Sequence, residues 1–248
     1  MILSDLHTHT TWCDGKNTPE EMVRAAIALG METLGFSGHS YVPFDDCCMT
    51  TEGTQQYRRE IDRLKHQYKG QLKILCGIEQ DYYSPAATDG YDYIIGSVHY
   101  LKLDNQYPAI DLDAQTLRQT ADHFFGGDVY ALAECYYDTV GDVVNRTGCN
   151  IVGHFDLVTK FNERDPMFDL QHPRYLAAWK AALDRLLQTG AAFEINTGAM
   201  SRGYRTSPYP AMDMIDYIRS HGGRLLLSSD SHSCETLLYH FEDYAQLL

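Results

Sequence analysis

Short apolar segments rich in valine, isoleucine, leucine and tyrosine alternate along this chain with longer segments of helical periodicity. The short segments predict strands over residues 2–6, 33–37, 72–78, 91–97, 150–153, 191–196 and 224–229. Strands that alternate with helices are joined by right-handed crossovers, so the pattern predicts an α/β protein with a mainly parallel sheet. Because no linker rich in serine, glycine or proline interrupts the alternation, residues 1–248 are expected to form one domain.

Helix signals fill most of the gaps between these strands. One helix is expected to begin after Thr18, a preferred N-cap residue that precedes a proline, and to stop at Gly30. Further helices are expected over 173–189 and over 207–221. A final amphipathic segment is expected to make core contacts through four residues at helical spacing, Leu237, Leu238, Phe241 and Tyr244.

Histidine and carboxylate side chains follow most of the predicted strands, close to where each strand ends. The nine residues are His7, His9, Asp14, His39, Glu79, His99, His154, Asp230 and His232. The carboxyl ends of parallel strands meet at one face, so side chains delivered by nearly every strand favour a closed barrel over an open sheet. A count of seven strands predicts an irregular relative of the eight-stranded TIM barrel.

These nine residues have the types and spacings expected of a metal centre. His7 and His9 are alternate residues leaving a strand, so both imidazoles can face one ion, and Asp230 and His232 repeat this spacing. Glu79 ends an apolar run, where a buried carboxylate must be paired or bound to metal, and its two oxygens can bridge two ions. Imidazole and carboxylate without thiolate suit zinc, manganese, iron or cobalt.

The alternative interpretation treats these residues as capping and core-rim side chains, which is the ordinary role of a single histidine after a strand. The complete set favours metal binding, and nine ligands are more than one or two ions need, so three divalent ions are expected. Cys13, beside Asp14, is expected to be a small packed residue. Four histidines outside the fragments are expected to be structural: His123, His172, His221 and His240.

The composition narrows the range of partners. The chain has 20 Lys and Arg against 34 Asp and Glu, a net charge of −14, and no basic run, so a small substrate is expected rather than nucleic acid. Seven cysteines at irregular spacing argue against a disulfide framework or a thiolate zinc site and favour a reduced cytoplasm. Neither a signal peptide nor an apolar run of about 18 residues is found, so neither secretion nor a membrane span is expected.

The fragments DLHTHTTWCDG, GHS, GIEQD, GSVHY, GHFDL, EINTGA and SSDSH follow one another along nearly the whole chain. In this order they resemble the PHP (polymerase and histidinol phosphatase) family, and in particular its histidinol-phosphate phosphatase branch. The resemblance implies a distorted seven-stranded (β/α) barrel, similar to a TIM barrel, with three metal ions at its C-terminal mouth. It assigns His7, His9, Glu79 and Asp230 to the first ion, Glu79, His99 and His154 to the second, and Asp14, His39 and His232 to the third.

The expected reaction is the hydrolysis of a small phosphomonoester, and the resemblance implies L-histidinol phosphate as substrate in histidine biosynthesis. Two ions bridged by Glu79 would lower the pKa of a shared water, so that hydroxide attacks phosphorus in line. Glu79, Asp230 and His232 are therefore the expected catalytic residues. Three basic residues in loops after strands are expected to bind the phosphate: Arg202, Arg205 and Lys160.

The other end of such a substrate carries an amine and an imidazole ring. Asp45, Glu163 and Asp165 are candidates to meet the amine, and the candidates to stack on the ring are Tyr41, Tyr100 and Tyr204. Two alternatives stay open at this point. The site could act on a phosphotyrosine protein or a nucleic acid end, or the chain could be a metal-bound regulatory domain without catalysis. Some relatives have histidine where this chain has Asp14, so the identity of the third ion also stays open.

Overall fold

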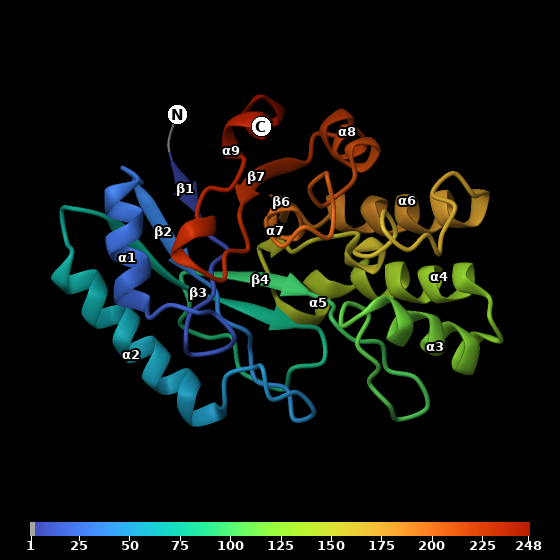
Figure 1. Cartoon of the computed structure of the whole chain (residues 1–248), viewed down its shortest axis with the longest axis horizontal. Helices are drawn as coiled ribbons and strands as arrows, with labels where there is room; N and C mark the ends of the chain where they lie inside the picture. Colours follow the sequence, from blue (N-terminus) through green and yellow to red (C-terminus); the bar gives the residue numbers. More distant parts are fainter. Residues whose placement is uncertain (1–2) are drawn as a thin grey trace.

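Seven parallel strands form the centre of the computed structural model, which describes residues 3–248 (Figure 1). They lie in the order β1 to β7, and each strand is hydrogen-bonded to the next. Their bounds are β1 Ser4–Asp5, β2 Thr33–Phe36, β3 Lys73–Asp81, β4 Tyr93–Ser97, β5 Ile151–Val152, β6 Ala192–Asn196 and β7 Arg224–Ser228. All seven predicted strands are present, and the predicted α/β class is confirmed.

The sheet closes into a barrel where the segments after β1 and β7 meet. Thr8 and Ser231 form a parallel bridge there. The backbone N–H of His9 donates to the Ser231 carbonyl over 2.8 Å, and the N–H of Ser231 donates to the His7 carbonyl over 3.1 Å. The predicted distorted seven-stranded barrel is therefore confirmed, and its closure brings the two ends of the chain's ligand set together.

The helices surround the strands (Figure 1). Their bounds are α1 Pro19–Ala28, α2 Thr51–Gln67, α3 Ala114–Phe125, α4 Val129–Val140, α5 Val143–Thr147, α6 Pro173–Leu187, α7 Gly198–Ser201, α8 Met212–Ser220 and α9 Phe241–Tyr244. Short 3₁₀ turns cover η1 Leu157–Thr159, η2 Cys234–Thr236 and η3 Ala245–Leu247. The blue helix α1 and the cyan helix α2 flank β2 and β3, whereas α3, α4 and α6 lie together at the opposite side. Between residues 3 and 248, no helix is both long and apolar enough to span a membrane.

Local sequence signals explain two of the helix boundaries. At the start of α1 the Thr18 side chain accepts from the backbone of Glu21, and the Glu21 side chain accepts from the backbone of Thr18, which is a complete capping box. Helix α6 begins at Pro173 and ends at Leu187, and it buries Trp179, Leu183 and Leu186 as the spacing predicts. The predicted face of this helix is confirmed, although Leu176 is only partly buried.

Several predicted bounds differ from the structure, and strand β3 extends beyond residue 78 to Asp81, so that Glu79 lies within it. Helix α8 begins at Met212 rather than at residue 207, because Tyr209 is held in an extended bridge with Asn196 by hydrogen bonds of 2.7 and 2.9 Å. The last helix, α9, has only four residues, because Leu238 and His240 adopt left-handed φ angles of 57° and 56°. Strand β1 covers only Ser4–Asp5, and residue 2 of the predicted strand lies outside the described residues.

An apolar layer fills the lower part of the barrel. Tyr93, Ile95 and Ile151 are buried there, against Leu6, Leu75 and Leu226. The Tyr93 ring occupies the space beside two glycines, since a Cβ on Gly35 would lie 2.4 Å from its hydroxyl and a Cβ on Gly77 would lie 2.3 Å from its Cζ. The hydroxyl lies 2.9 Å from the Phe36 carbonyl, an acceptor for its proton. This layer forms the floor on which the polar upper part of the barrel rests.

Candidate metal centre

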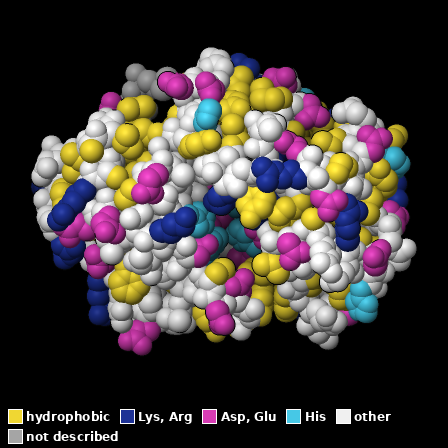
Figure 2. All heavy atoms as spheres, in the orientation of Figure 1, with side chains coloured by type: hydrophobic (Ala, Val, Ile, Leu, Met, Phe, Trp, Pro, Cys, Tyr) yellow, Lys and Arg dark blue, Asp and Glu magenta, His cyan; other side chains and the backbone are white. Residues whose placement is uncertain are grey.

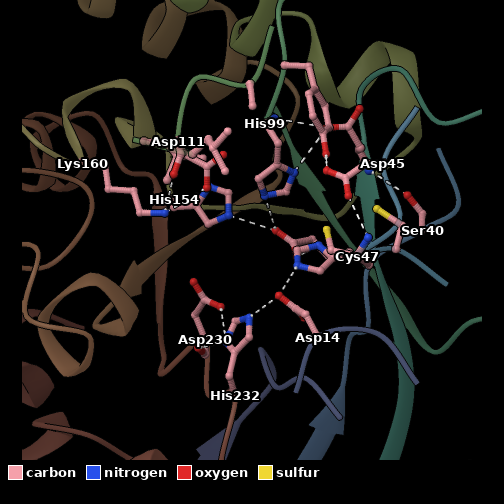
Figure 3. A pocket seen from close by; sticks show the side chains of 18 of the residues that line it. Asp14, Ser40, Asp45, Cys47, His99, Asp111, His154, Lys160, Asp230 and His232 are labelled. Atoms are coloured by element: carbon pink, nitrogen blue, oxygen red, sulfur yellow. Dashed lines mark hydrogen bonds and ion pairs between the residues drawn. The ribbon is translucent and has the colours of Figure 1, made fainter. Parts of the chain in front are cut away.

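The structure brings all nine predicted ligands together at the C-terminal mouth of the barrel. Histidines 7 and 9 follow β1, Glu79 lies in β3, His99 and His154 follow β4 and β5, and Asp230 and His232 follow β7. A cavity of about 320 Å³ opens onto the cluster, a size that suits a small molecule. Figure 2 shows it as a hollow near the centre of the face, with histidine and acidic side chains at its bottom. Figure 3 shows the ligands converging from different strand ends.

The potential donor atoms fall into four overlapping groups. Within each group, one atom of every residue lies within 4.8 Å of the others. The groups are His9, Asp14, His39 and His232; His7, His9 and Asp230; His7, Glu79 and His154; and His39, Glu79 and His99. This grouping resembles the three ligand sets implied by the family resemblance, with Glu79 shared between neighbouring groups. Assignment of individual ions to these groups stays a prediction.

Glu79 lies at the centre of the cluster and presents one oxygen to each side. Its Oε1 is 2.9 Å from His154 Nε2 and 3.3 Å from His99 Nε2. Its Oε2 is 3.3 Å from His7 Nε2, 3.5 Å from His9 Nε2 and 2.9 Å from His39 Nδ1. Backbone pairing of His39 with Glu79 extends the β2–β3 ladder to this point. A carboxylate in this position can bridge two cations.

Several buried nitrogen and oxygen atoms of the cluster, all potential metal ligands, lack hydrogen-bond partners among residues 3–248. Among them are His7 Nε2, His9 Nε2 and Glu79 Oε2, all in residues that are at most 1% exposed. The approach of His39 Nδ1 to Glu79 Oε2 at 2.9 Å does not have the geometry of a hydrogen bond. An unsatisfied buried polar atom costs about 1–3 kcal/mol, so native structures rarely leave several of them side by side. Divalent cations would satisfy all three atoms, and the imidazole and carboxylate chemistry of the set fits them.

The electrostatic environment keeps both carboxylates and His9 in forms that bind cations. Although burial opposes it, the neighbouring carboxylates raise the pKa of His7 and His39 well above its usual range, so a bound cation would displace a proton from each. Burial alone would raise the pKa of Glu79, but the surrounding histidines 39, 7 and 99 hold that pKa well below its usual range. Burial would also raise the pKa of Asp230, but Arg202 and His7 hold it well below its usual range. Burial, together with the neighbouring His232 and His39, lowers the pKa of His9 to about 3, which keeps this imidazole neutral. The carboxylates are therefore ionised and His9 is unprotonated.

Hydrogen bonds behind the cluster fix which ring nitrogen faces the centre. His7 Nδ1–H donates to Glu194 Oε2 over 2.9 Å, which leaves Nε2 free. His232 Nδ1 lies 2.9 Å from the Asp230 carbonyl, and Arg202 Nη1 donates to the same carbonyl over 3.0 Å. Arg202 Nη1 also lies 3.0 Å from His232 Nδ1, so these three groups form one network, and His232 Nε2 faces Asp14 Oδ2 at 3.1 Å.

Glu194 on β6 is the main residue of this site that the sequence patterns did not single out. It is 1% exposed and accepts from the backbone of His154 over 2.6 Å, from Asn196 Nδ2 over 2.8 Å and from Ser228 Oγ over 2.5 Å, in addition to His7. It lies within the EINTGA fragment. A charged residue in the middle of an apolar strand was the signal that could have identified it.

The predicted phosphate-binding residues occupy different environments. Arg202 and Lys160 line the cavity: Arg202 donates to Asp230 Oδ2 over 3.0 Å, and Lys160 donates to Asp111 Oδ2 over 3.1 Å. Arg205 is not among the cavity-lining residues of the described chain, and its buried guanidinium donates to Asp156 over 3.0 Å. Because the Arg205 guanidinium is buried and paired with Asp156, its position does not favour contact with phosphate.

Of the residues expected to bind the amine and the ring of a substrate, some line the cavity and others do not. Asp45, Tyr100 and Tyr204 line the cavity. Glu163 accepts from Thr206 and Asp165 pairs with Arg118, so both carboxylates are used elsewhere. Neither they nor Tyr41 are among the cavity-lining residues of the described chain, and the same holds for the four histidines expected to be structural, His123, His172, His221 and His240.

A seven-stranded barrel with a cluster of imidazoles and carboxylates at its mouth defines a protein of the multi-metal barrel class. The PHP domain matches residues 5–198, and the chain belongs to the PHP family, as the sequence fragments predict. It is 27% identical to the histidinol-phosphatase of Bacillus subtilis, over 99% of each chain.

Two solved structures have a similar fold. A candidate histidinol phosphatase of Listeria monocytogenes has a TM-score of 0.83 at 20% identity, covering 97% of this chain and 99% of its own. The histidinol phosphate phosphatase of Lactococcus lactis, in complex with zinc, L-histidinol and phosphate, has a TM-score of 0.71 at 21% identity, covering 99% of this chain and 92% of its own. These likenesses extend over the whole barrel.

Proposed function

We propose that this protein is a metal-dependent phosphomonoesterase that hydrolyses L-histidinol phosphate to L-histidinol and phosphate. The observation that carries the proposal is the set of buried, unpartnered donor atoms around Glu79 at the bottom of a cavity of small-molecule size. The likeness to the histidinol-phosphatase of Bacillus subtilis over 99% of both chains supports the choice of substrate. So does the Lactococcus lactis phosphatase, whose structure contains zinc, L-histidinol and phosphate.

Three divalent ions are proposed to occupy the cluster. The first would be held by His7, His9, Glu79 and Asp230, the second by Glu79, His99 and His154, and the third by Asp14, His39 and His232. When bound, such ions supply a hydroxide nucleophile near neutral pH and positive charge for the phosphoryl oxygens. Zinc, manganese and iron all suit this donor set.

The protein's own side chains would position the reacting groups. Glu79 holds the two halves of the cluster together, because each of its oxygens faces a different group of imidazoles. Arg202 orients Asp230 through its carboxylate and its carbonyl, and its guanidinium reaches the cavity, where it can also meet a phosphoryl oxygen. Lys160 is a second cation on the cavity wall, with its Nζ 5.0 Å from the centre of the Tyr204 ring.

Two properties of the chain support a location in the cytoplasm and a small substrate. All seven cysteines lie within the described residues and are free thiols, which supports a reducing compartment such as the cytoplasm. A net charge of −14 and the absence of a basic run support a small substrate rather than nucleic acid.

A phosphate-release assay across small monoesters tests the proposal. The kcat/KM for L-histidinol phosphate is expected to exceed that for p-nitrophenyl phosphate by orders of magnitude, and chelation followed by readdition of zinc or manganese should remove and restore activity. A phosphotyrosine peptide and a 3′-phosphorylated oligonucleotide provide the matched comparisons. Equal turnover of all substrates would overturn the physiological assignment, and an inactive protein with fewer than about one ion per chain would favour a regulatory domain instead.

A further inference from the structure

A second group of potential metal ligands lies on the rim of the cavity, in the loop between β2 and α2. It consists of Asp45, Cys47 and Cys48, and one ligand atom of each lies within 4.8 Å of the others. All three residues line the cavity, and Figure 3 shows Asp45 and Cys47 on the same side of it as Ser40. None of them belongs to the nine ligands of the centre below.

The Asp45 carboxylate is held in place before any ligand binds. Its Oδ1 accepts from the backbone N–H of Cys47 over 2.8 Å, and its Oδ2 accepts from the hydroxyl of Tyr100. The Tyr100 ring is itself 6% exposed and meets Phe44 edge-on at 4.9 Å. Hydrogen bonds of this kind orient a ligating carboxylate, and each oxygen keeps a further lone pair for a cation.

The two thiols give this group a chemistry that differs from that of the main centre. Both are free, Cys47 is exposed, and Cys48 is half-buried. Two sulfurs and one oxygen form a soft donor set, whereas the main centre offers only imidazole nitrogens and carboxylate oxygens. The neighbouring Cys48 and partial burial raise the pKa of the Cys47 thiol, so a cation must displace a proton from it. Hard ions such as magnesium and manganese bind thiolate too weakly to do this.

We propose that Asp45, Cys47 and Cys48 form a separate binding site for one thiophilic divalent cation, such as zinc or cadmium, on the rim of the cavity. Three protein ligands leave the fourth position of a tetrahedral ion open towards the cavity. The loop is tied to the main centre through the backbone N–H of Met49, which donates to the carbonyl of His39 over 3.2 Å. An ion bound on the rim would therefore lie at the entrance to the hydrolytic site.

The test is a cadmium titration of the full-length protein, kept in excess manganese so that hard ions occupy the main centre. Cadmium bound to thiolate gives a near-ultraviolet charge-transfer band, and elemental analysis counts the ions. The band is expected to saturate at about one cadmium per chain in the native protein. The band should be lost in the double variant that carries Cys47→Ser and Cys48→Ser. The single variant Asp45→Asn should weaken cadmium binding about tenfold while leaving the band at saturation.

Three single variants serve as controls. Cys135→Ser and Cys234→Ser remove thiols that do not line the cavity and should leave the titration unchanged. Cys13→Ser tests the competing source of a thiolate signal, because Cys13 Sγ lies 3.5 Å from His9 Nδ1 in the main centre. Loss of the band in Cys13→Ser, or an unchanged band in the double variant, would overturn the proposal. The readout does not depend on phosphatase activity, so its failure is distinct from failure of the proposed function.

Discussion

The barrel interior has two layers that are built from the same strands and behave differently. Strand β4 contributes Tyr93 and Ile95 to the lower layer, and its last residue, Ser97, together with His99 beyond its end, belongs to the upper one. The lower layer is apolar and close-packed. In the upper layer, His7, His9 and Glu79 are just as deeply buried, but each has a side-chain nitrogen or oxygen without a hydrogen-bond partner among residues 3–248.

The difference shows how one fold separates stability from chemistry. The lower layer needs nothing from outside, because its one polar side-chain group, the Tyr93 hydroxyl, has carbonyl acceptors at Leu6 and Phe36. The upper layer is completed only when cations replace the missing partners. Substitutions in the upper layer should therefore change ion affinity and catalysis, whereas substitutions in the lower layer should change the free energy of unfolding.

The largest effect is expected for Glu79→Gln. A neutral amide cannot bridge two cations, and several kcal/mol of charge stabilisation would be lost, so kcat/KM should fall by about a thousandfold with a loss of bound ions. Steady-state kinetics and elemental analysis measure both quantities. Glu134→Gln is the matched control, since Glu134 pairs with Arg174 on the helices away from the mouth. Retention of full activity in Glu79→Gln would contradict the role of Glu79 and the distinction between the layers.

Glu194→Gln should have the next largest effect, although Glu194 touches no proposed ion. The two carboxylate oxygens of Glu194 accept from His7 Nδ1–H and from the backbone N–H of His154. A glutamine amide has only one acceptor oxygen for these two N–H groups. Loss of such a partner typically weakens metal affinity about 10–100-fold. Isothermal titration with zinc or manganese measures this, with Glu134→Gln again as the control. An ion affinity equal to that of the control would mean that His7 is oriented without Glu194.

Arg202→Ala should reduce activity about tenfold or more, seen as a higher KM or a lower kcat. The substitution removes a cation from the cavity and two hydrogen bonds that orient Asp230. Arg24→Ala is a suitable control, because Arg24 lies on α1 with a side chain that is 71% exposed. Unchanged kinetics in Arg202→Ala would remove this residue from the site.

The smallest effect is expected in the lower layer. Ile95→Val removes one methyl group from a side chain that is fully buried, which should lower the free energy of unfolding by about 1 kcal/mol. Urea denaturation of the ion-free protein measures this change, and ion content and kcat should stay at native values. A loss of ions comparable to that of Glu194→Gln would show that the two layers are not energetically separate.

The order of strands and the positions of the ligands were predictable because both depend on short-range patterns. Apolar runs mark the strands, and the residue that follows each run must lie at the mouth of a parallel barrel. Glu163, Asp165 and Arg205 were less predictable, because each lies in a loop near the mouth and is paired within the protein by a contact distant in sequence. Loop residues of one type can face the cavity or a neighbouring side chain, and the pattern does not distinguish these outcomes.

By itself, the sequence determined the α/β barrel, its family and the nine side chains at its mouth, since local periodicity and residue order carry that information. Tertiary structure decided how those side chains are supported. It placed Glu194 behind His7, directed Arg202 rather than Arg205 to the cavity, and put Asp45 beside two thiols on its rim. The contacts of Glu194 with His7, of Arg202 with Asp230 and of Tyr100 with Asp45 join residues far apart in the chain, and only the folded barrel brings those residues within hydrogen-bonding distance.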